Sequence, residues 1–134
     1  MFGPAGYAYV YMIYGFYFCL NVVTERKGYP AAVLIRGMEP LENLDFMRQL
    51  RNNPKSETNI ASGPGKVCMA MSIDKRLNGE DLMGRSLWME DRNLEVGPIR
   101  SSARVGVDYA GEYRDRPWRF YIDGNPHVSR ARFR

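Results

Sequence analysis

The stretch Tyr7–Val23, YAYVYMIYGFYFCLNVV, decides how the N-terminal part of this sequence folds. As one strand it would extend to roughly 56 Å, whereas a compact chain of 134 residues has a diameter of about 36 Å. The stretch must therefore fold back on itself. Gly15 is its only turn-forming residue, which predicts a β-hairpin with Tyr14 and Gly15 at the tip. An aromatic side chain at such a tip is poorly placed for a core and well placed to contact another molecule.

The first strand of this predicted hairpin is rich in tyrosine. Tyr7, Tyr9 and Tyr11 share one face, because successive side chains of a strand point to opposite sides. Such a face suits stacking on a planar ligand, for example a nucleobase. From composition alone, packing of a half-buried sheet is the preferred explanation. Asn21 stands alone in the apolar return strand, where a buried amide needs partners and, facing a base, would distinguish the groups on its edge.

Length and composition predict one domain, since 134 residues with 45% hydrophobic content suffice for one core and not for two ordinary ones. Lysine and arginine outnumber the acidic residues by 19 to 15, which permits an acidic partner without requiring one. Positive charge is concentrated in the last third, although a solvated surface is the simpler explanation for any single residue there. These arginines are Arg100, Arg104, Arg114, Arg116, Arg119, Arg130, Arg132 and Arg134.

The two cysteines, Cys19 and Cys68, are far apart and have no histidine cluster near them. The sequence therefore predicts no disulfide framework, no metal site and no cofactor, and it fits a reducing compartment. The N-terminal MFGPAG lacks the features of a secretion signal. Tyr7–Val23 is short for a membrane-spanning helix and contains Asn21, so a membrane protein is rejected. We expect a cytoplasmic protein, associated with the nucleoid if the source is a prokaryote.

Short strands and helices are predicted beyond the hairpin. Ala31–Arg36 reads as a short buried strand with Arg36 at its charged end. Apolar residues recur at helical spacing over Leu41–Leu50, which predicts a surface helix with Arg48 and Arg51 turned away from the core. Both assignments depend on local pattern alone.

The segment Ser62–Ile73 predicts a second helix that begins at Pro64, because proline suits the first position of a helix. Further strands are predicted at Ser86–Glu90, Arg104–Val107 and Trp118–Ile122. Strands and short helices without a regular alternation indicate an α+β fold. We expect a single domain with a largely antiparallel sheet, short helices and a protruding hairpin.

The start of the second helix also has chemical interest. Ser62–Lys66, SGPGK, is a turn of small residues that leads into a helix N-terminus with Lys66 in its first turn. Free backbone N–H groups and the helix dipole favour an anion such as phosphate at this place. The spacing of an ATP-binding P-loop is absent, so a DNA phosphate suits it better. An ordinary helix start explains the same residues equally well.

Five strings of the sequence together resemble the alkyladenine (3-methyladenine) DNA glycosylases of the mixed α/β type. The resemblance runs in order through essentially the whole sequence and is more specific than any single motif. The strings are MFGPAGYAYVYMIYGFYFCLNVV (1–23), AAVLIRGMEPLENLDFMRQLR (31–51), SGPGKVCMAMSID (62–74), ARVGVDYAGEY (103–113) and PWRFYIDGNPHVS (117–129).

The resemblance implies a hairpin that enters the DNA minor groove and a pocket that holds a flipped, damaged base. Tyr14 matches the tyrosine that intercalates into the gap left by that base. Tyr11 matches a tyrosine of the pocket wall, and Asn21 matches the asparagine that helps to exclude guanine. Phe16 and Tyr17 match positions that line the DNA interface.

The same resemblance assigns roles farther along the chain. Arg36 matches an arginine beside the backbone of the target nucleotide and the attacking water. Val105 matches a pocket residue whose main chain meets the base edge, and Gly65 with Lys66 matches a pair that contacts phosphate. The implied activity is hydrolysis of the N-glycosidic bond of an alkylated or deaminated purine by a monomer acting on double-stranded DNA.

A general base completes the active site of that family. It is a glutamate upstream of the MFGP string, and this sequence begins at that string, so we expect a single domain, residues 1–134, that lacks the family's N-terminal portion. Arg36 supports catalysis without replacing the base, because a guanidinium has no lone pair to accept a proton. Glu39, Glu25 and Asp108 are weak substitutes. Two alternatives remain open: a non-catalytic remnant that binds DNA lesions, and a structural or interaction domain.

Overall fold

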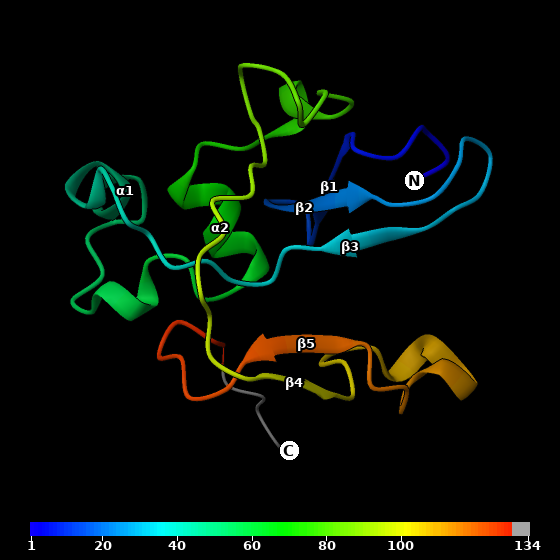
Figure 1. Ribbon diagram of the computed structural model, residues 1–134. Helices are drawn as coiled ribbons and strands as arrows, with labels where there is room; N and C mark the ends of the chain where they lie inside the picture. The colour runs from blue at the N-terminus through cyan, green and yellow to red at the C-terminus, as the bar shows by residue number, and fades with distance from the viewer. Residues whose placement is uncertain (130–134) are drawn as a thin grey trace.

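The computed structural model describes residues 1–129, which form two antiparallel sheets and two short α-helices (Figure 1). The predicted α+β class is confirmed. The first sheet has the order β1 (Ala8–Ile13), β2 (Tyr17–Val23), β3 (Ala32–Leu34), and the second pairs β4 (Ile99–Ser102) with β5 (Arg119–Ile122). The helices are α1 (Leu44–Leu50) and α2 (Pro64–Ala70), with 3₁₀ turns at Glu57–Asn59, Lys75–Leu77 and Asp108–Tyr113. Arg130, Arg132 and Arg134 lie outside the described residues.

The long apolar stretch folds back as its length requires. β1 and β2 pair in antiparallel register from Ala8 opposite Val22 to Ile13 opposite Tyr17. Tyr14 and Gly15 both have positive φ, 54° and 77°, and the Phe16 N–H donates to the Ile13 carbonyl at 3.4 Å. Two successive left-handed residues match the twist of the strands they join. The predicted reversal at Tyr14 and Gly15 agrees with this pairing.

The core lies on one face of the β1–β2 pair. Ala8 and Val10 of β1 and Leu20 of β2 are buried there together with Cys68 of α2. α2 packs against β2 on one side and against α1 on the other, as its central place in Figure 1 shows. A second buried cluster, on the side of α2 toward α1, consists of Ile60, Ala61, Val67 and Ala70.

The outer edge of β1 is covered by the chain that follows the Lys75–Leu77 turn. The Val10 N–H donates to Oδ1 of Asn78 at 2.9 Å, and the Ala8 N–H donates to the Glu80 carbonyl at 2.8 Å. These bonds satisfy backbone groups that an open sheet edge would expose. The segment after the Lys75–Leu77 turn thus pairs with the outer edge of β1, the edge strand of the first sheet.

The second sheet lies below the first in Figure 1 and is reached through a long exposed segment, residues 89–98. Ile99 of β4 pairs with Ile122 of β5 at one end of this sheet. Beyond the other end, Trp118 stacks on Tyr113 with ring centroids 5.7 Å apart, and the Arg104 guanidinium lies 5.3 Å from the Trp118 ring. Exposed rather than buried contacts therefore dominate this part.

Several predicted strands need correction. Trp118–Ile122 contains β5, as expected, but Ser86–Glu90 is no strand and has only one isolated bridge nearby, between Met83 and Trp88. Arg104–Val107 is also no strand, because Gly106 has φ 74° and breaks the extended path. The actual partner of β5 is β4. Its sequence IRSS lacks the alternation of apolar and polar residues that predicts a strand.

The region around Arg36 and Arg51 also differs from expectation. β3 is half-exposed rather than buried, and Arg36 lies two residues past its end. Arg48 and Arg51 do not face away into solvent. Arg51 donates from Nε to the Ile60 carbonyl at 2.8 Å and from Nη2 to the Asn59 carbonyl at 3.3 Å, while Arg48 reaches the Pro54 carbonyl at 3.2 Å. The polar loop after α1 thus uses both side chains to satisfy its carbonyls.

Within residues 1–129 no helix is long and apolar enough to cross a membrane.

A matched pair of isoleucines tests the location of the core. Ile60→Ala should lower the free energy of unfolding by about 2–5 kcal/mol, because Ile60 is 0% exposed and its removal leaves a cavity. Ile99→Ala makes the same chemical change at a side chain that is 64% exposed and should cost far less. Denaturant titration of both variants measures the difference, and equal losses would contradict this placement of the core.

Cys68 predicts how stability depends on alkaline pH. Burial raises the pKa of its thiol from 9.0 to about 11. Above pH 9.0 the unfolded chain loses this proton while the folded chain keeps it, so the free energy of unfolding should fall as pH rises toward 11. Cys68→Ala should show a smaller fall over the same range. Unfolding titrations at about pH 8 and about pH 10.5 measure both slopes, and identical slopes would refute the prediction.

Candidate functional site

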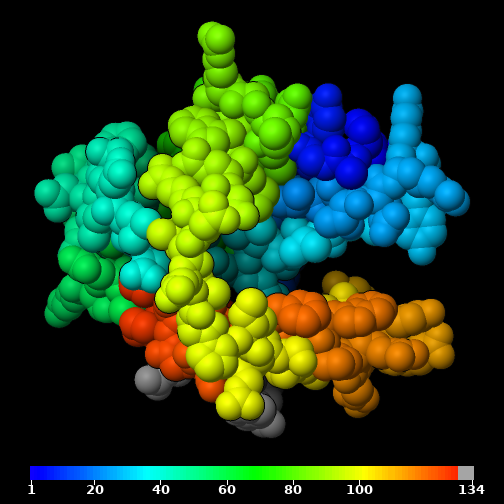
Figure 2. Space-filling model, viewed as in Figure 1, coloured from blue at the N-terminus to red at the C-terminus, as the bar shows by residue number. Residues whose placement is uncertain are grey.

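A cavity of about 520 Å³ lies between the β1–β2 pair, the start of α2 and the segment 105–109. We refer to it as the tyrosine cavity. The molecule is visibly hollowed between the part that carries β2 and β3 and the part that carries β4 and β5 (Figure 2). Seven of the predicted site residues line the tyrosine cavity: Tyr11, Tyr14, Tyr17, Arg36, Gly65, Lys66 and Val105.

The second face of the β1–β2 pair forms one wall of this cavity. Tyr11 stands opposite Cys19, and Ile13 stands opposite Tyr17, so all four side chains share the face that turns away from the core. Burial raises the pKa of the Tyr11 hydroxyl, and the neighbouring Cys19 thiol adds to this effect. Tyr11 therefore presents an uncharged ring and hydroxyl to the cavity at neutral pH.

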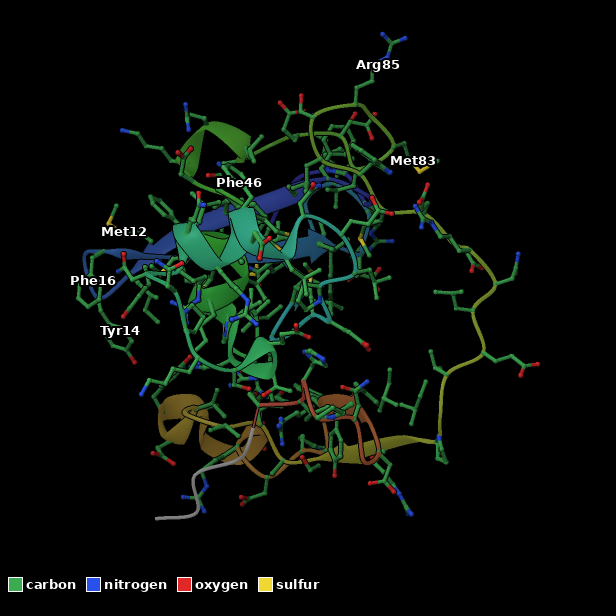
Figure 3. The ribbon with its side chains drawn as sticks, turned by 90° about the vertical axis from the view of Figure 1, so that its left-hand side faces the viewer. Met12, Tyr14, Phe16, Phe46, Met83 and Arg85 are labelled. Carbon is green, nitrogen blue, oxygen red and sulfur yellow. The ribbon has the colours of Figure 1, made fainter. Side chains whose placement is uncertain are left out.

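The tip of the β1–β2 pair is apolar and exposed. Met12, Tyr14 and Phe16 project together from its end, as the labels in Figure 3 show. Tyr14 is 79% exposed, although its ring also borders the tyrosine cavity. Phe16 packs on Tyr17 with ring centroids 4.3 Å apart and does not line the cavity. The tip thus offers aromatic surface both to the cavity and to the outside.

The start of α2 forms the opposite wall. Pro64 occupies the first helical position, as predicted, and Gly65 follows it. A Cβ atom on Gly65 would lie 3.1 Å from Cδ1 of Tyr17, so the absence of a side chain allows the Tyr17 ring to approach the helix. The Lys66 ammonium donates to Oδ1 of Asn59, which holds the lysine at the wall of the cavity.

Arg36 lies in the wall of the tyrosine cavity, whereas Asn21 does not line it. Arg36 borders the cavity, and its Nε is buried without a hydrogen-bond partner among residues 1–129. Burial, and then the nearby Arg119, lower the pKa of the Arg36 guanidinium. Asn21 is buried beside the cavity rather than in its wall, and its Nδ2 donates to the Tyr9 carbonyl at 3.2 Å. Asn21 pairs with Tyr9, which places its side chain on the same face of β2 as Cys19, two residues farther from the tip.

Sequence reasoning missed several residues of the wall. Cys19 could have been found from the two-residue period of β2, since it alternates with Tyr17, and Met69 from the helical period, four residues after Gly65. The sequence predicted that Arg51 lies on the outer face of its helix. No local pattern predicted that Tyr109 lines the cavity. The missed wall residues are Ile13, Cys19, Leu34, Arg51, Gly63, Pro64, Met69, Gly106, Val107 and Tyr109.

The chemistry of this wall is aromatic and cationic. Tyrosines supply ring faces, and Arg36, Arg51 and Lys66 supply positive charge. No aspartate or glutamate lines the cavity in the described part of the chain. In residues 1–129 no group of three or more histidine, cysteine, aspartate or glutamate side chains is placed to hold a metal ion. The cavity is therefore suited to a planar ligand that brings negative charge with it, such as a base with its phosphate.

Comparison with known proteins identifies the family of this chain. The family model for methylpurine-DNA glycosylase (MPG) matches residues 1–126. A protein of Methanocella arvoryzae is 54% identical over 97% of this chain and 65% of its own length, and one of Alkaliphilus oremlandii is 48% identical over 97% and 68%. A Desulfitobacterium hafniense protein is 45% identical over 96% and 67%. All three bear the provisional name 3-methyladenine DNA glycosylase.

The chain spans about two thirds of the length of these relatives, at 65% to 68% of each. The match covers the tip, both helices and the segment that closes the tyrosine cavity. The resemblance inferred from the sequence is thereby confirmed. The chain belongs to the methylpurine-DNA glycosylase family, a family of DNA repair enzymes that act on DNA.

Proposed function

We propose that this chain acts in DNA base-excision repair by inserting the β1–β2 tip into duplex DNA and holding a damaged purine in the tyrosine cavity. One observation carries the proposal: the exposed Tyr14 borders the same cavity as Tyr11, Tyr17 and Arg36. The Tyr14 side chain, which projects from the tip, can then fill the gap that a flipped base leaves in the DNA duplex when that base enters the cavity. We further propose that the chain works as a monomer in the cytoplasm, without a cofactor.

Tyr14 has the properties of a wedge. Its ring is exposed and its backbone is fixed by a tight turn with φ 54°. Extruding a base from a duplex costs a few kcal/mol, and a side chain inserted into the stack offsets part of that cost. A damaged base is easier to extrude, so selection for lesions begins before the base reaches the cavity.

The cavity wall can add to this selection. Purines methylated at N3 or N7 carry positive charge, and the faces of Tyr11, Tyr17 and Tyr109 can attract that charge by about 0.5–2 kcal/mol. The Tyr11 hydroxyl is neutral at physiological pH, and burial raises its pKa further above the ordinary value of 10.0, so this attraction is of the cation–π kind. A volume of about 520 Å³ lies within the usual range for small-molecule sites. The name of the relatives, which refers to 3-methyladenine, agrees with such a base.

The remaining predicted residues divide between base and backbone. We assign Val105, which lines the cavity, to the base edge, and Asn21, one step deeper on the same face of the sheet, to discrimination against guanine. Gly65 and Lys66 are assigned to a DNA phosphate, for which Lys66 would exchange its bond to Asn59. Phe16 and Tyr17, packed together at the tip, belong to the DNA interface.

Excision requires a base that activates water. Arg36 can hold a phosphate or a water by donation, but its guanidinium cannot accept a proton. Glu39 does not line the tyrosine cavity, and neither Glu25 nor Asp108 does so. Among the described residues, the wall of the cavity thus has the aromatic and cationic side chains that we assign to recognition, and it has no carboxylate. This observation favours a second candidate function, lesion binding without excision.

A single-turnover assay separates the two functions. The chain in excess over a duplex with one hypoxanthine or ethenoadenine should release the base if it acts as a glycosylase. In parallel, competition binding compares this duplex with an undamaged one of the same sequence. Preference for the lesion without release supports lesion binding alone, and absence of both release and preference contradicts both functions.

Tyr14→Ala tests the wedge. Loss of the inserted ring should weaken binding to the lesion duplex by about tenfold or more, because stacking of a base on an aromatic ring contributes about 1–3 kcal/mol. Tyr29→Ala is the matched control, since Tyr29 is an exposed tyrosine in the loop at the opposite end of the same sheet. Fluorescence anisotropy measures both affinities. Equal affinity of Tyr14→Ala and the unmodified chain would indicate an interaction domain in which Tyr14 does not meet DNA.

A further inference from the structure

A second cavity, of about 260 Å³, lies on the other side of Arg36. Its walls come from the segment 36–39 after β3, from β5 and from the segment 125–129. These segments are far apart in the sequence, and Figure 1 shows the chain after β3 approaching the region where β5 and the end of the described chain meet. Arg36 borders both this cavity and the tyrosine cavity.

Two arginines face this second cavity with little to neutralise them. Arg119 is only 8% exposed; its Nη2 donates to the Ser129 carbonyl, and its guanidinium lies 5.1 Å from the Tyr121 ring. Arg36 contributes the buried Nε that has no hydrogen-bond partner among residues 1–129. Neither arginine has an ion pair with any described carboxylate. Buried cations are normally paired, because removal from water is costly.

The other polar groups of the cavity strengthen this imbalance. Nδ1 of His127 is buried and lacks a partner in the described part of the chain. Glu39 is the one carboxylate among the described wall residues, and it is exposed and engaged by Nδ2 of Asn125 at 3.4 Å. The proximity of Arg119 also lowers the pKa of Arg36, after the larger effect of burial, as expected for like charges without an anion between them.

We propose that Arg36, Arg119 and His127 form a binding site for a phosphate-class oxyanion. Two guanidinium groups present planar sets of N–H donors that match the oxygens of phosphate. A doubly charged oxyanion balances both arginines, which a single carboxylate does not. The volume of about 260 Å³ holds such an ion with several waters, since one water takes about 30 Å³ in the liquid. The phosphate can be free in solution or belong to a DNA backbone.

Occupation of this site affects the tyrosine cavity through Arg36. An anion beside its guanidinium stabilises the charged form and fixes the side chain that both cavities share. The proposal does not depend on glycosylase activity, because its readout is binding of a small ion. Its failure and the failure of the proposed function are therefore distinguishable.

The test is a calorimetric and thermal titration of the purified chain with inorganic phosphate, with chloride as the control at constant ionic strength. Phosphate should raise the melting temperature and bind in a saturable manner, and chloride should do neither. Arg119→Gln should weaken phosphate binding by at least about tenfold, as expected for loss of a charge-assisted hydrogen bond. Arg100→Gln is the matched control: Arg100 is an exposed arginine of β4, paired with Asp123 at 3.0 Å, and its loss should leave binding unchanged.

His127→Ala keeps the test valid if Arg119→Gln fails to fold, because His127 is only half-buried. This variant should also weaken phosphate binding while the Arg100→Gln control retains it. Equal responses to phosphate and chloride, or unchanged binding in His127→Ala and Arg119→Gln, would overturn the proposal. A duplex without terminal phosphates then identifies the source: competition with inorganic phosphate indicates a backbone phosphate in the site, whereas simultaneous binding indicates free phosphate. Both results support the same chemistry at Arg36 and Arg119.

Discussion

The antiparallel pairing of β1 with β2 is the constraint on which the rest of the structure depends. It is forced by length, because Tyr7–Val23 is too long and too apolar to remain one strand in a chain of this size. Once the pair forms, its two-residue period divides every side chain between two faces. Ala8, Val10 and Leu20 turn toward α2 and form a core, while Tyr11, Tyr17 and Cys19 turn the other way and form the wall of a cavity. One pairing register thus fixes both the stability and the site.

α2 serves both faces of this arrangement. Its buried residues fill the core beside β2 and α1, and its first turn reaches the tyrosine cavity. Gly65 joins the two roles, since a side chain at this position would meet the Tyr17 ring. A short helix of seven residues gains little stability from its own hydrogen bonds. Packing against the core therefore fixes the position of α2, and the position of α2 in turn fixes one wall of the tyrosine cavity.

Features with a strong local pattern were predictable from the sequence, and features made by distant contacts were not. The reversal at Tyr14 and Gly15 and the helix start at Pro64 each depend on one or two residues with clear conformational preferences. β4 has no such pattern, because only its partner β5 makes IRSS a strand. Arg51 looked like a solvated residue of an amphipathic helix, yet the polar loop after α1 brings two carbonyls to it. The wall residue Tyr109 depends on how the second sheet lies against the first, which no local pattern encodes.

Arg36 stands between two cavities, and this position has a consequence for the genetics of the protein. A substitution there changes the charge of both spaces at once, so its phenotype is the sum of two effects that need not have the same sign. Arg119 borders the second cavity alone, and Tyr11 borders the tyrosine cavity alone. Double-mutant cycles of Arg36 with each of these residues would therefore apportion its contribution. Arg36 is thus a wall residue of both cavities, whereas Arg119 and Tyr11 each report on one cavity only.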